Sequence, residues 1–452
     1  MIDIDGHIIE HLSVLKDFLR DEGSEMVRRF EVMMREDPPS GTGSYSRREC
    51  KSAWWGLTAR TLDRATCMAP GLLHERLDEL GFDVSVLYPT FGLVCLTLAD
   101  PELRVAACRA ENRMNAELVG PYADRLVPVA AVPMHTPDEA LEVLRHATDE
   151  LGFRAAVIPP GVGRPIPRLA EDAFPVASYL DSYGIDSPHD YDVVWEEFNS
   201  RGIPVASHGA AALRYLPSGR RSPSNYVFNH VGAHAYQQAE LCRALIMGGV
   251  PSRFPDLRFV FLESGVSWGM QLLADMVEHW EKRNGESVRD LDPARLDSEE
   301  LAGLLRTYGG RRFEDLGQYV EDRPSSSVAT AWEDEWRASG VTSPDVLRRM
   351  FEEQFFFGCE ADDRGMYTAF SSTKNPLGVE LQPLLGSDIG HWDVQRTEDV
   401  LEECFELVSG DVISGEEFEK LTFVNPQRLY MQGQPTFFAG TTVGDAVVRS
   451  GS

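Results

Sequence analysis

Acidic and histidine side chains recur at the points where short apolar runs of the sequence end. Asp5 and His7 close the first run, and in an extended strand residues i and i+2 point to the same side. His208, Glu263 and Asp388 each follow a later run of the same kind. Zinc, manganese and iron all accept such mixed sets of carboxylate and imidazole ligands. Because the carboxyl ends of parallel barrel strands share one rim, the sequence predicts a metal site there.

Three further histidines add to this set. His230 and His234 are spaced i, i+4, so on a helix both would lie on one face, as paired metal ligands often do. Either one could instead cap a helix or contact a substrate. His391 could bind the metal, orient a substrate or support Asp388. A mononuclear site needs only four or five ligands, so the larger number of candidates favours two metals.

The elements that must position these residues are eight apolar runs separated by stretches with helical patterns. Near-continuous apolar runs suit strands covered on both faces. They fall at Ile2–Asp5, Asp83–Pro89, Leu126–Met134, Arg154–Pro159, Ile203–Ser207, Leu257–Leu262, Gln354–Cys359 and Pro383–Gly386. Eight such units predict an α/β chain that forms a (β/α)₈ TIM barrel. A doubly wound open sheet is disfavoured because no GxGxxG turn follows the first run.

We expect one elaborated domain over residues 1–452. The uneven spacing of the runs predicts an insertion or cap at 20–80, after strand 1, and a helical insertion at 280–350, after strand 6. Helices and a tail are expected over 395–452. The insertions could serve as lids, as contacts in a homo-oligomer or, equally well, as surface decoration. Gly161-Val162-Gly163 is interpreted as a turn and the Phe355–Phe357 run as barrel core.

Composition limits the possible partners. The chain carries 72 acidic and 43 basic residues, and a net charge of −29 disfavours nucleic acid and membrane surfaces. Seven scattered cysteines without a CxxC pair indicate reduced thiols. Without a secretory signal or an apolar stretch long enough to span a bilayer, we expect a soluble, cytoplasmic protein. Arg220-Arg221 and Arg311-Arg312 could hold a CoA phosphate, although solvated surface is the simpler interpretation.

The sequence resembles the amidohydrolase-related family, in the branch of aminocarboxymuconate-semialdehyde decarboxylase and aromatic-acid decarboxylases. The resemblance lies in DIDGH at the start, VASHG at the fifth run, GGVPSRFPDLRFVFLESG at the sixth and LLGSDIGHWD at the eighth. In that family an HxH or ExH motif, a His after strand 5 and an Asp after strand 8 bind the metal. The resemblance therefore implies a TIM barrel with the ligands Asp5, His7, His208 and Asp388.

Two departures from the family pattern bear on the reaction. Asp5 occupies the first position of the HxH motif and offers a harder oxygen donor. Glu263 stands where decarboxylases and many hydrolases of the family place a catalytic His. To donate a proton, Glu263 would need a pKa raised by several units, whereas as a carboxylate it could bridge two ions. These features are similar to a nonheme diiron monooxygenase branch, represented by the diterpenoid hydroxylase of platensimycin and platencin biosynthesis.

The leading hypothesis from the sequence is thus a diiron monooxygenase that hydroxylates a small organic acid or its CoA thioester, including terpenoid intermediates. It would hold two Fe ions through the ligands Asp5, His7, His208, His230, His234, Glu263 and Asp388. It would require O₂ and an external electron donor, because no flavin or nicotinamide motif is visible. The alternative is a mononuclear Zn or Mn hydrolase or decarboxylase. Catalytic roles are predicted for Glu263, Asp388 and His391.

Overall fold

The fold was analysed in a computed structural model of the chain. It describes residues 1–36, 57–166, 178–209, 222–292, 295–315, 334–391 and 393–446. Part of the insertion expected at 20–80, the Arg220-Arg221 pair, part of the insertion expected at 280–350 and the end of the tail lie outside the described residues.

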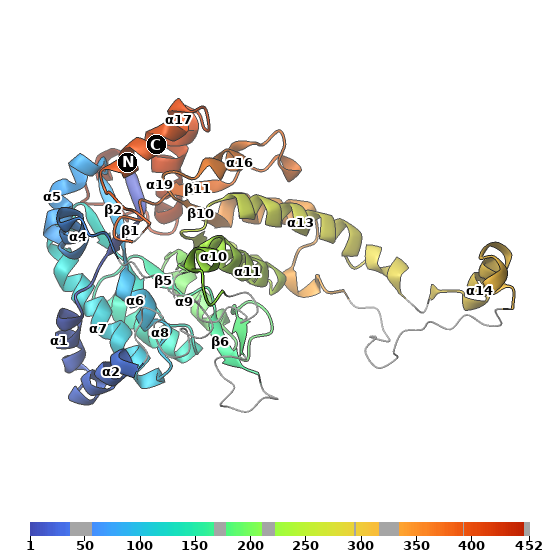
Figure 1. Cartoon of the computed structure of the whole chain (residues 1–452), viewed down its shortest axis with the longest axis horizontal. Coiled ribbons are helices and arrows are strands. Elements are labelled where there is room, and N and C mark those ends of the chain that lie inside the picture. Colours follow the sequence, from blue (N-terminus) through green and yellow to red (C-terminus); the bar gives the residue numbers. More distant parts are fainter. Residues whose placement is uncertain are drawn as a thin grey trace.

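The eight predicted strands form a closed parallel barrel, which confirms the predicted fold (Figure 1). The third predicted strand is divided at Val129 into two short strands. The eight strand positions of the barrel are therefore filled by nine assigned strands. They are β1 (Ile2–Ile8), β2 (Val84–Pro89), β3 (Leu126–Pro128), β4 (Ala130–Ala131), β5 (Ala156–Ile158), β8 (Val205–Ser207), β9 (Phe259–Phe261), β10 (Phe355–Cys359) and β11 (Gln382–Leu385). Neighbours in this order pair with each other, except that β3 and β4 follow one another along the same line of the barrel. The N–H of Asp388 donates to the Asp5 carbonyl and the N–H of His7 to the Ile389 carbonyl, and these bonds close the seam between β11 and β1.

The strands are buried on both faces, as their apolar character requires. Every residue of β1, β2, β10 and β11 is buried. Phe355 packs edge-to-face on Phe259 and Phe261, and Phe357 makes a tilted ring contact with Phe261, so the aromatic run belongs to the core, as predicted.

Helices surround the barrel and follow its strands. The described helices before β8 are α1 (Leu12–Asp21), α2 (Ser24–Glu36), α4 (Thr61–Met68), α5 (Pro70–Leu80), α6 (Thr90–Cys95), α7 (Pro101–Val119), α8 (Pro137–Arg145) and α9 (Asp192–Ser200). Those after β8 are α10 (Tyr226–His230), α11 (Ala233–Met247), α12 (Val250–Arg253), α13 (Ser267–Arg283), α14 (Ser298–Tyr308), α15 (Pro344–Arg349), α16 (Tyr367–Phe370), α17 (Asp399–Ser409), α18 (Gly415–Glu419) and α19 (Asn425–Met431).

Two regions depart from a plain barrel. β6 (Val162–Pro165) and β7 (Ser178–Asp181) form an antiparallel pair outside the barrel. The prediction of a turn at Gly161-Val162-Gly163 was therefore wrong, because Val162 and Gly163 pair with Asp181 and Leu180. The second region is an extension that leaves the barrel along α13 and ends at α14, well away from the body (Figure 1).

Within the described part of the chain, none of the helices combines the length and the apolar character needed to cross a membrane.

Candidate metal centre

Strand β1 supplies three inward polar residues in alternation. Asp3, Asp5 and His7 are all buried, and alternation along a strand turns them to one side. The Asp3 carboxylate accepts bonds from the hydroxyls of Ser85 (2.6 Å) and Ser387 (2.9 Å) and from the backbone N–H of Ser387 (2.9 Å). It thereby joins β1 to β2 and to the segment after β11 that carries Asp388.

Four of the predicted ligands converge at this seam. His7 Nε2 lies 3.5 Å from Asp5 Oδ1, 3.5 Å from Asp388 Oδ1 and 3.2 Å from His208 Nε2. His208 Nε2 lies 3.9 Å from Asp5 Oδ1. Donors held at about 2.1 Å from one tetrahedral ion are about 3.4 Å apart, so these spacings suit a shared cation.

Two buried oxygens of this cluster lack a partner. Asp5 Oδ1 and Asp388 Oδ2 accept no hydrogen bond in the described part of the chain, although their residues are 2% and 1% exposed. A buried carboxylate without a partner is costly, and a bound cation removes that cost. The donor set thus fits the divalent metal that its residue types indicate.

Burial also sets the protonation of these groups. Desolvation raises the pKa of Asp5 and of Asp388 well above the usual range, and the negative charge of Glu263 adds to both shifts. Desolvation lowers the pKa of His208 to about 3 and that of His7 well below its usual value. The two imidazoles are therefore neutral at pH 7, which is the form that binds metals.

Backbone strain marks two of the site residues. Glu263 and Asp388, which follow β9 and β11, both have φ of 49°. This left-handed conformation costs a residue with a side chain about 1–2 kcal/mol, and such strain gathers at functional sites. Two backbone hydrogen bonds hold Asp388 in this conformation. The Asp388 N–H donates to the Asp5 carbonyl (2.9 Å), and the His391 N–H donates to the Asp388 carbonyl (3.0 Å).

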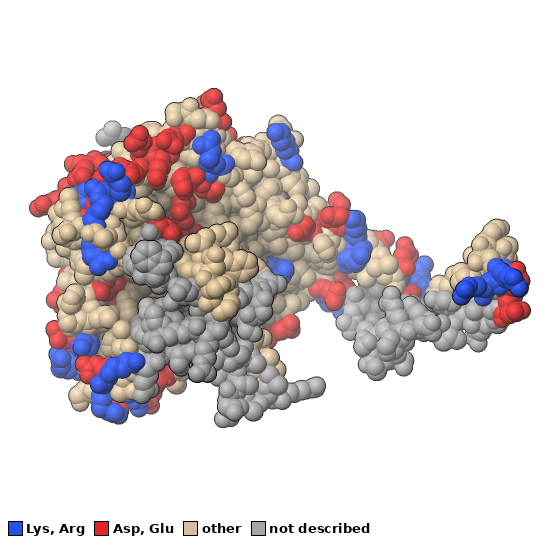
Figure 2. Space-filling view, viewed as in Figure 1, with Lys and Arg blue, Asp and Glu red and all other residues tan. Residues whose placement is uncertain are grey.

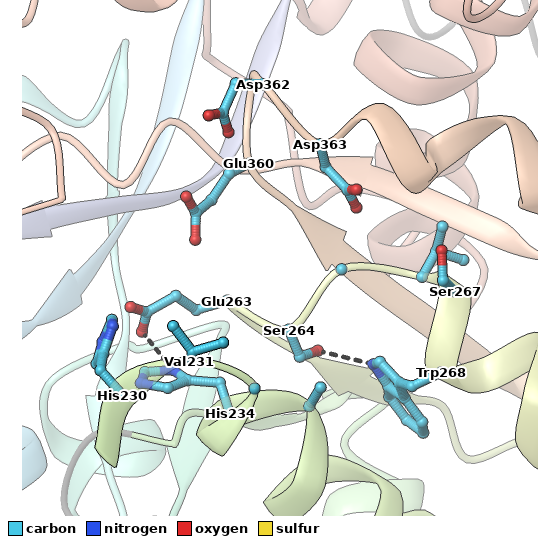
Figure 3. Close-up of a pocket in the computed structure, with 14 residues that line it drawn as sticks. His230, Val231, His234, Glu263, Ser264, Ser267, Trp268, Glu360, Asp362 and Asp363 are labelled. Atoms are coloured by element: carbon cyan, nitrogen blue, oxygen red, sulfur yellow. Dashed lines mark hydrogen bonds and ion pairs between the residues drawn. The ribbon is translucent and has the colours of Figure 1, made fainter. Parts of the chain in front are cut away.

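Glu263 connects the first cluster to a second one. Its Oε2 lies 3.4 Å from His208 Nε2. The same oxygen lies 3.0 Å from His234 Nδ1 (Figure 3). The ion pair lowers the pKa of the Glu263 carboxyl and raises that of His234, although burial opposes both shifts. The ligand atoms of His230, His234 and Glu263 lie within 4.8 Å of one another, and Glu263 also forms such a group with Asp388 and His391.

The position of His391 fits either of two roles: a metal ligand, or a support for Asp388. Its Nδ1 is 2.7 Å from Asp388 Oδ1, and its ring stacks on that of His7 with centroids 3.6 Å apart. It is grouped with His7 and His208 as a possible ligand. All predicted site residues are therefore brought to one rim, and His230 is the least buried of them.

A pocket of about 420 Å³ opens beside the second cluster (Figure 3). Its described lining includes no Lys or Arg, and its polar groups include Glu263, Ser264, Glu360, Asp362 and Asp363. Glu360 follows β10 and faces Glu263 across the pocket. Desolvation and the charge of Glu263 raise the pKa of Glu360 to about 8.

The sequence analysis missed Asp3 and Glu360. A signal for Glu360 was present, because it follows an apolar run in the same way as Glu263. Asp3 lies inside the first run, two positions before Asp5, and the alternation along that run could have identified it.

The fold is a (β/α)₈ barrel, and one rim of it carries carboxylates and imidazoles that could share a metal ion. A family model described as amidohydrolase matches residues 2–313, and the chain belongs to this family.

Solved structures share the fold at low sequence identity. A dihydroxybenzoic acid decarboxylase from Polaromonas sp. JS666, with bound manganese and 2-nitroresorcinol, is 16% identical, with 97% of this chain and 98% of that chain covered and a TM-score of 0.51. A 2,6-dihydroxybenzoate decarboxylase bound to 2,6-dihydroxybenzoate is 14% identical (95% and 98% covered, TM-score 0.50). An amidohydrolase from Mycobacterium avium subsp. paratuberculosis K-10 is 17% identical (95% and 98% covered, TM-score 0.53).

These comparisons do not confirm the diiron monooxygenase branch. Membership of the amidohydrolase family is closer to the alternative, a metal-dependent hydrolase or decarboxylase, than to the leading hypothesis. Two Fe ions, O₂ and an electron donor receive no support from them.

Proposed function

We propose that the protein is a divalent-metal-dependent decarboxylase or hydrolase that acts on a carboxylic acid. One observation carries the proposal: Asp5, His7, His208 and Asp388 present donor atoms at ligand spacing, with buried carboxylate oxygens that have no other described partner. Membership of the amidohydrolase family and the manganese bound by a fold neighbour support one Mn or Zn ion.

When bound, such an ion would polarise a substrate carboxyl group or activate water. The residues of the chain supply the rest of the site. The described pocket wall carries no Lys or Arg. The His234 imidazole, paired with Glu263 at 3.0 Å, can hold a proton beside the pocket. Burial of this pair limits the access of water.

The test is metal analysis and product analysis of anaerobically purified protein. We expect one Mn or Zn per chain, and CO₂ release or hydrolysis under argon from a panel of aromatic and unsaturated carboxylic acids. Asp388→Asn should lose both metal and activity, whereas Asp362→Asn, at an exposed carboxylate of the same pocket, should keep its metal. Protein that binds no divalent metal, or an Asp388→Asn variant with unchanged metal affinity, would refute the proposal.

A dinuclear oxygenase is the second candidate, and the second cluster favours it. The Glu263 carboxylate lies 3.4 Å from His208 Nε2 and 3.0 Å from His234 Nδ1, which are separations expected between ligands of one ion. It is therefore placed to be shared by two ions. The two candidates differ in metal count. Two Fe per chain, falling to one in His234→Ala, together with O₂ consumption that needs reductant, would establish the oxygenase. One ion per chain, unchanged in His234→Ala, would exclude it.

A further inference from the structure

The extension beyond α13 carries apolar side chains that are exposed in the described part of the chain. We call the described residues 284–292 and 295–315 the arm. Its helix α14 places Leu301, Leu304, Leu305 and Tyr308 on one face by their i, i+3, i+4, i+7 spacing. Tyr308 is 82% exposed and Leu304 is 49% exposed. Of the residues of α14, Ala302 alone is buried in the described part of the chain.

An arm of this kind has little stability alone. An isolated helix of 11 residues is marginal in water, and most helical stability comes from the packing of the apolar face. α14 stands apart from the barrel (Figure 1). Its apolar face therefore needs a surface that the described body of the same chain does not provide.

The charge of the arm tip indicates which kind of surface that is. From Leu301 to Phe313 the sequence contains three arginines and no acidic residue, between Asp297, Glu299 and Glu300 at the start of α14 and Glu314 and Asp315 beyond the tip. Arg311 and Arg312 are exposed. In a chain with net charge −29, this tip combines apolar and positive groups, which suits an apolar surface next to carboxylates.

The mouth of the pocket is such a surface. Val227 and Phe228 on α10, and Val231 after it, are 55%, 65% and 74% exposed, and Val231 lines the pocket. Glu360 and Asp362 line the same pocket. In the space-filling view, uncharged surface over α10 lies next to a group of acidic side chains (Figure 2).

The arm of the same chain is carried away from this mouth. α13 begins at Ser267 and Trp268, which line the pocket, and runs outward as a continuous helix of 17 residues. At 1.5 Å per residue, this helix displaces the arm by about 25 Å from its own pocket. In a two-fold dimer with antiparallel α13 helices, each arm would instead reach the pocket of the other copy.

We propose that the protein dimerises by exchange of arms, with α14 and the Arg311-Arg312 tip of one copy packed on the α10 surface and acidic pocket mouth of the other. The contact buries the apolar faces of both regions and covers the entrance of the proposed active site. This inference goes beyond the proposed function and does not depend on it.

The test is sedimentation and light scattering of the full chain over a range of concentrations. We expect a dimer. Leu304→Asp with Tyr308→Asp on the arm, and separately Val231→Asp on the body, should each raise the dimer Kd by about a hundredfold or more, as loss of buried apolar anchors does. Val193→Asp is the matched control, since Val193 is 53% exposed on α9 and belongs neither to the arm nor to the lining of the pocket, and its dimer should be unchanged.

Charge variants sharpen the assignment of the partner surface. Arg311→Glu with Arg312→Glu should weaken the dimer about tenfold at low salt, and Asp362→Arg in the same chain should restore part of the loss. A monomer at every concentration, or a dimer unaffected by both the arm and the Val231 variants, would overturn the proposal. Metal content measured on the same samples separates this result from the proposed function, because the arm lies outside the metal cluster.

Discussion

Two carboxylates on the same strand, two residues apart and equally buried, have opposite surroundings. Asp3 and Asp5 are each 2% exposed on β1. The oxygens of Asp3 accept bonds from Ser85, from Ser387 and from the N–H of Asp5. Asp5 Oδ1 faces two imidazoles and Asp388 and accepts none in the described part of the chain. The hydrogen bonds of Asp3 are therefore supplied by the protein, whereas Asp5 Oδ1 is placed to bind a cation.

The difference teaches that burial alone does not identify a functional carboxylate. Burial raises the pKa of both residues, but hydrogen bonds counteract the shift at Asp3, while the charges of Asp388 and Glu263 reinforce it at Asp5. A cation would stabilise the charged form of Asp5 strongly and that of Asp3 weakly. Removal of the metal should therefore disfavour the charged form of Asp5 much more than that of Asp3.

The largest effect is expected at Asp388, the partner of Asp5 in the unsatisfied group. Loss of a residue that only supports a metal ligand costs about 10–100-fold in affinity, so Asp388→Asn should cost at least about a hundredfold in metal affinity and a similar factor in activity. In chelator-treated protein the same change should raise the free energy of unfolding, because it removes a buried acid whose charge is disfavoured. Metal titration and urea unfolding measure the two effects, and destabilised metal-free protein would contradict this account.

Asp3→Asn should give the opposite sign in the metal-free protein. The Asn amide nitrogen cannot accept the bonds that one Asp3 oxygen now accepts, so the free energy of unfolding should fall by about 1–3 kcal/mol. Metal affinity should fall by about 10–100-fold, because Ser387 next to Asp388 loses its anchor. Ser85→Ala removes one of these bonds and serves as a milder control. If Asp3→Asn stabilises the metal-free protein, as Asp388→Asn should, the contrast between the two carboxylates fails.

The sequence was informative where local chemistry and burial agree. Eight apolar runs predicted the eight strands of the barrel, because strands that are buried on both faces consist almost entirely of apolar residues. Residues after those runs predicted the rim cluster because the barrel places strand ends together. The sequence could not show which carboxylate is satisfied, since Asp3 depends on Ser85 and Ser387, which are 82 and 384 residues away. The β6–β7 pair was hidden because its glycines resemble those of a turn.

The last effect concerns the pH dependence of stability and is expected at Glu360. Its folded pKa of about 8 lies above the ordinary value of 4.5, so the folded protein keeps a proton that the unfolded chain releases. Stability of the metal-free protein should therefore fall as pH rises from about 4.5 to about 8, since the unfolded state binds fewer protons in that window. Glu360→Gln should make this pH dependence shallower, whereas Asp190→Asn, at an exposed carboxylate elsewhere, should leave it unchanged. Chemical unfolding at a series of pH values measures the slope, and an unaltered slope in Glu360→Gln would show that Glu360 is not the group that titrates.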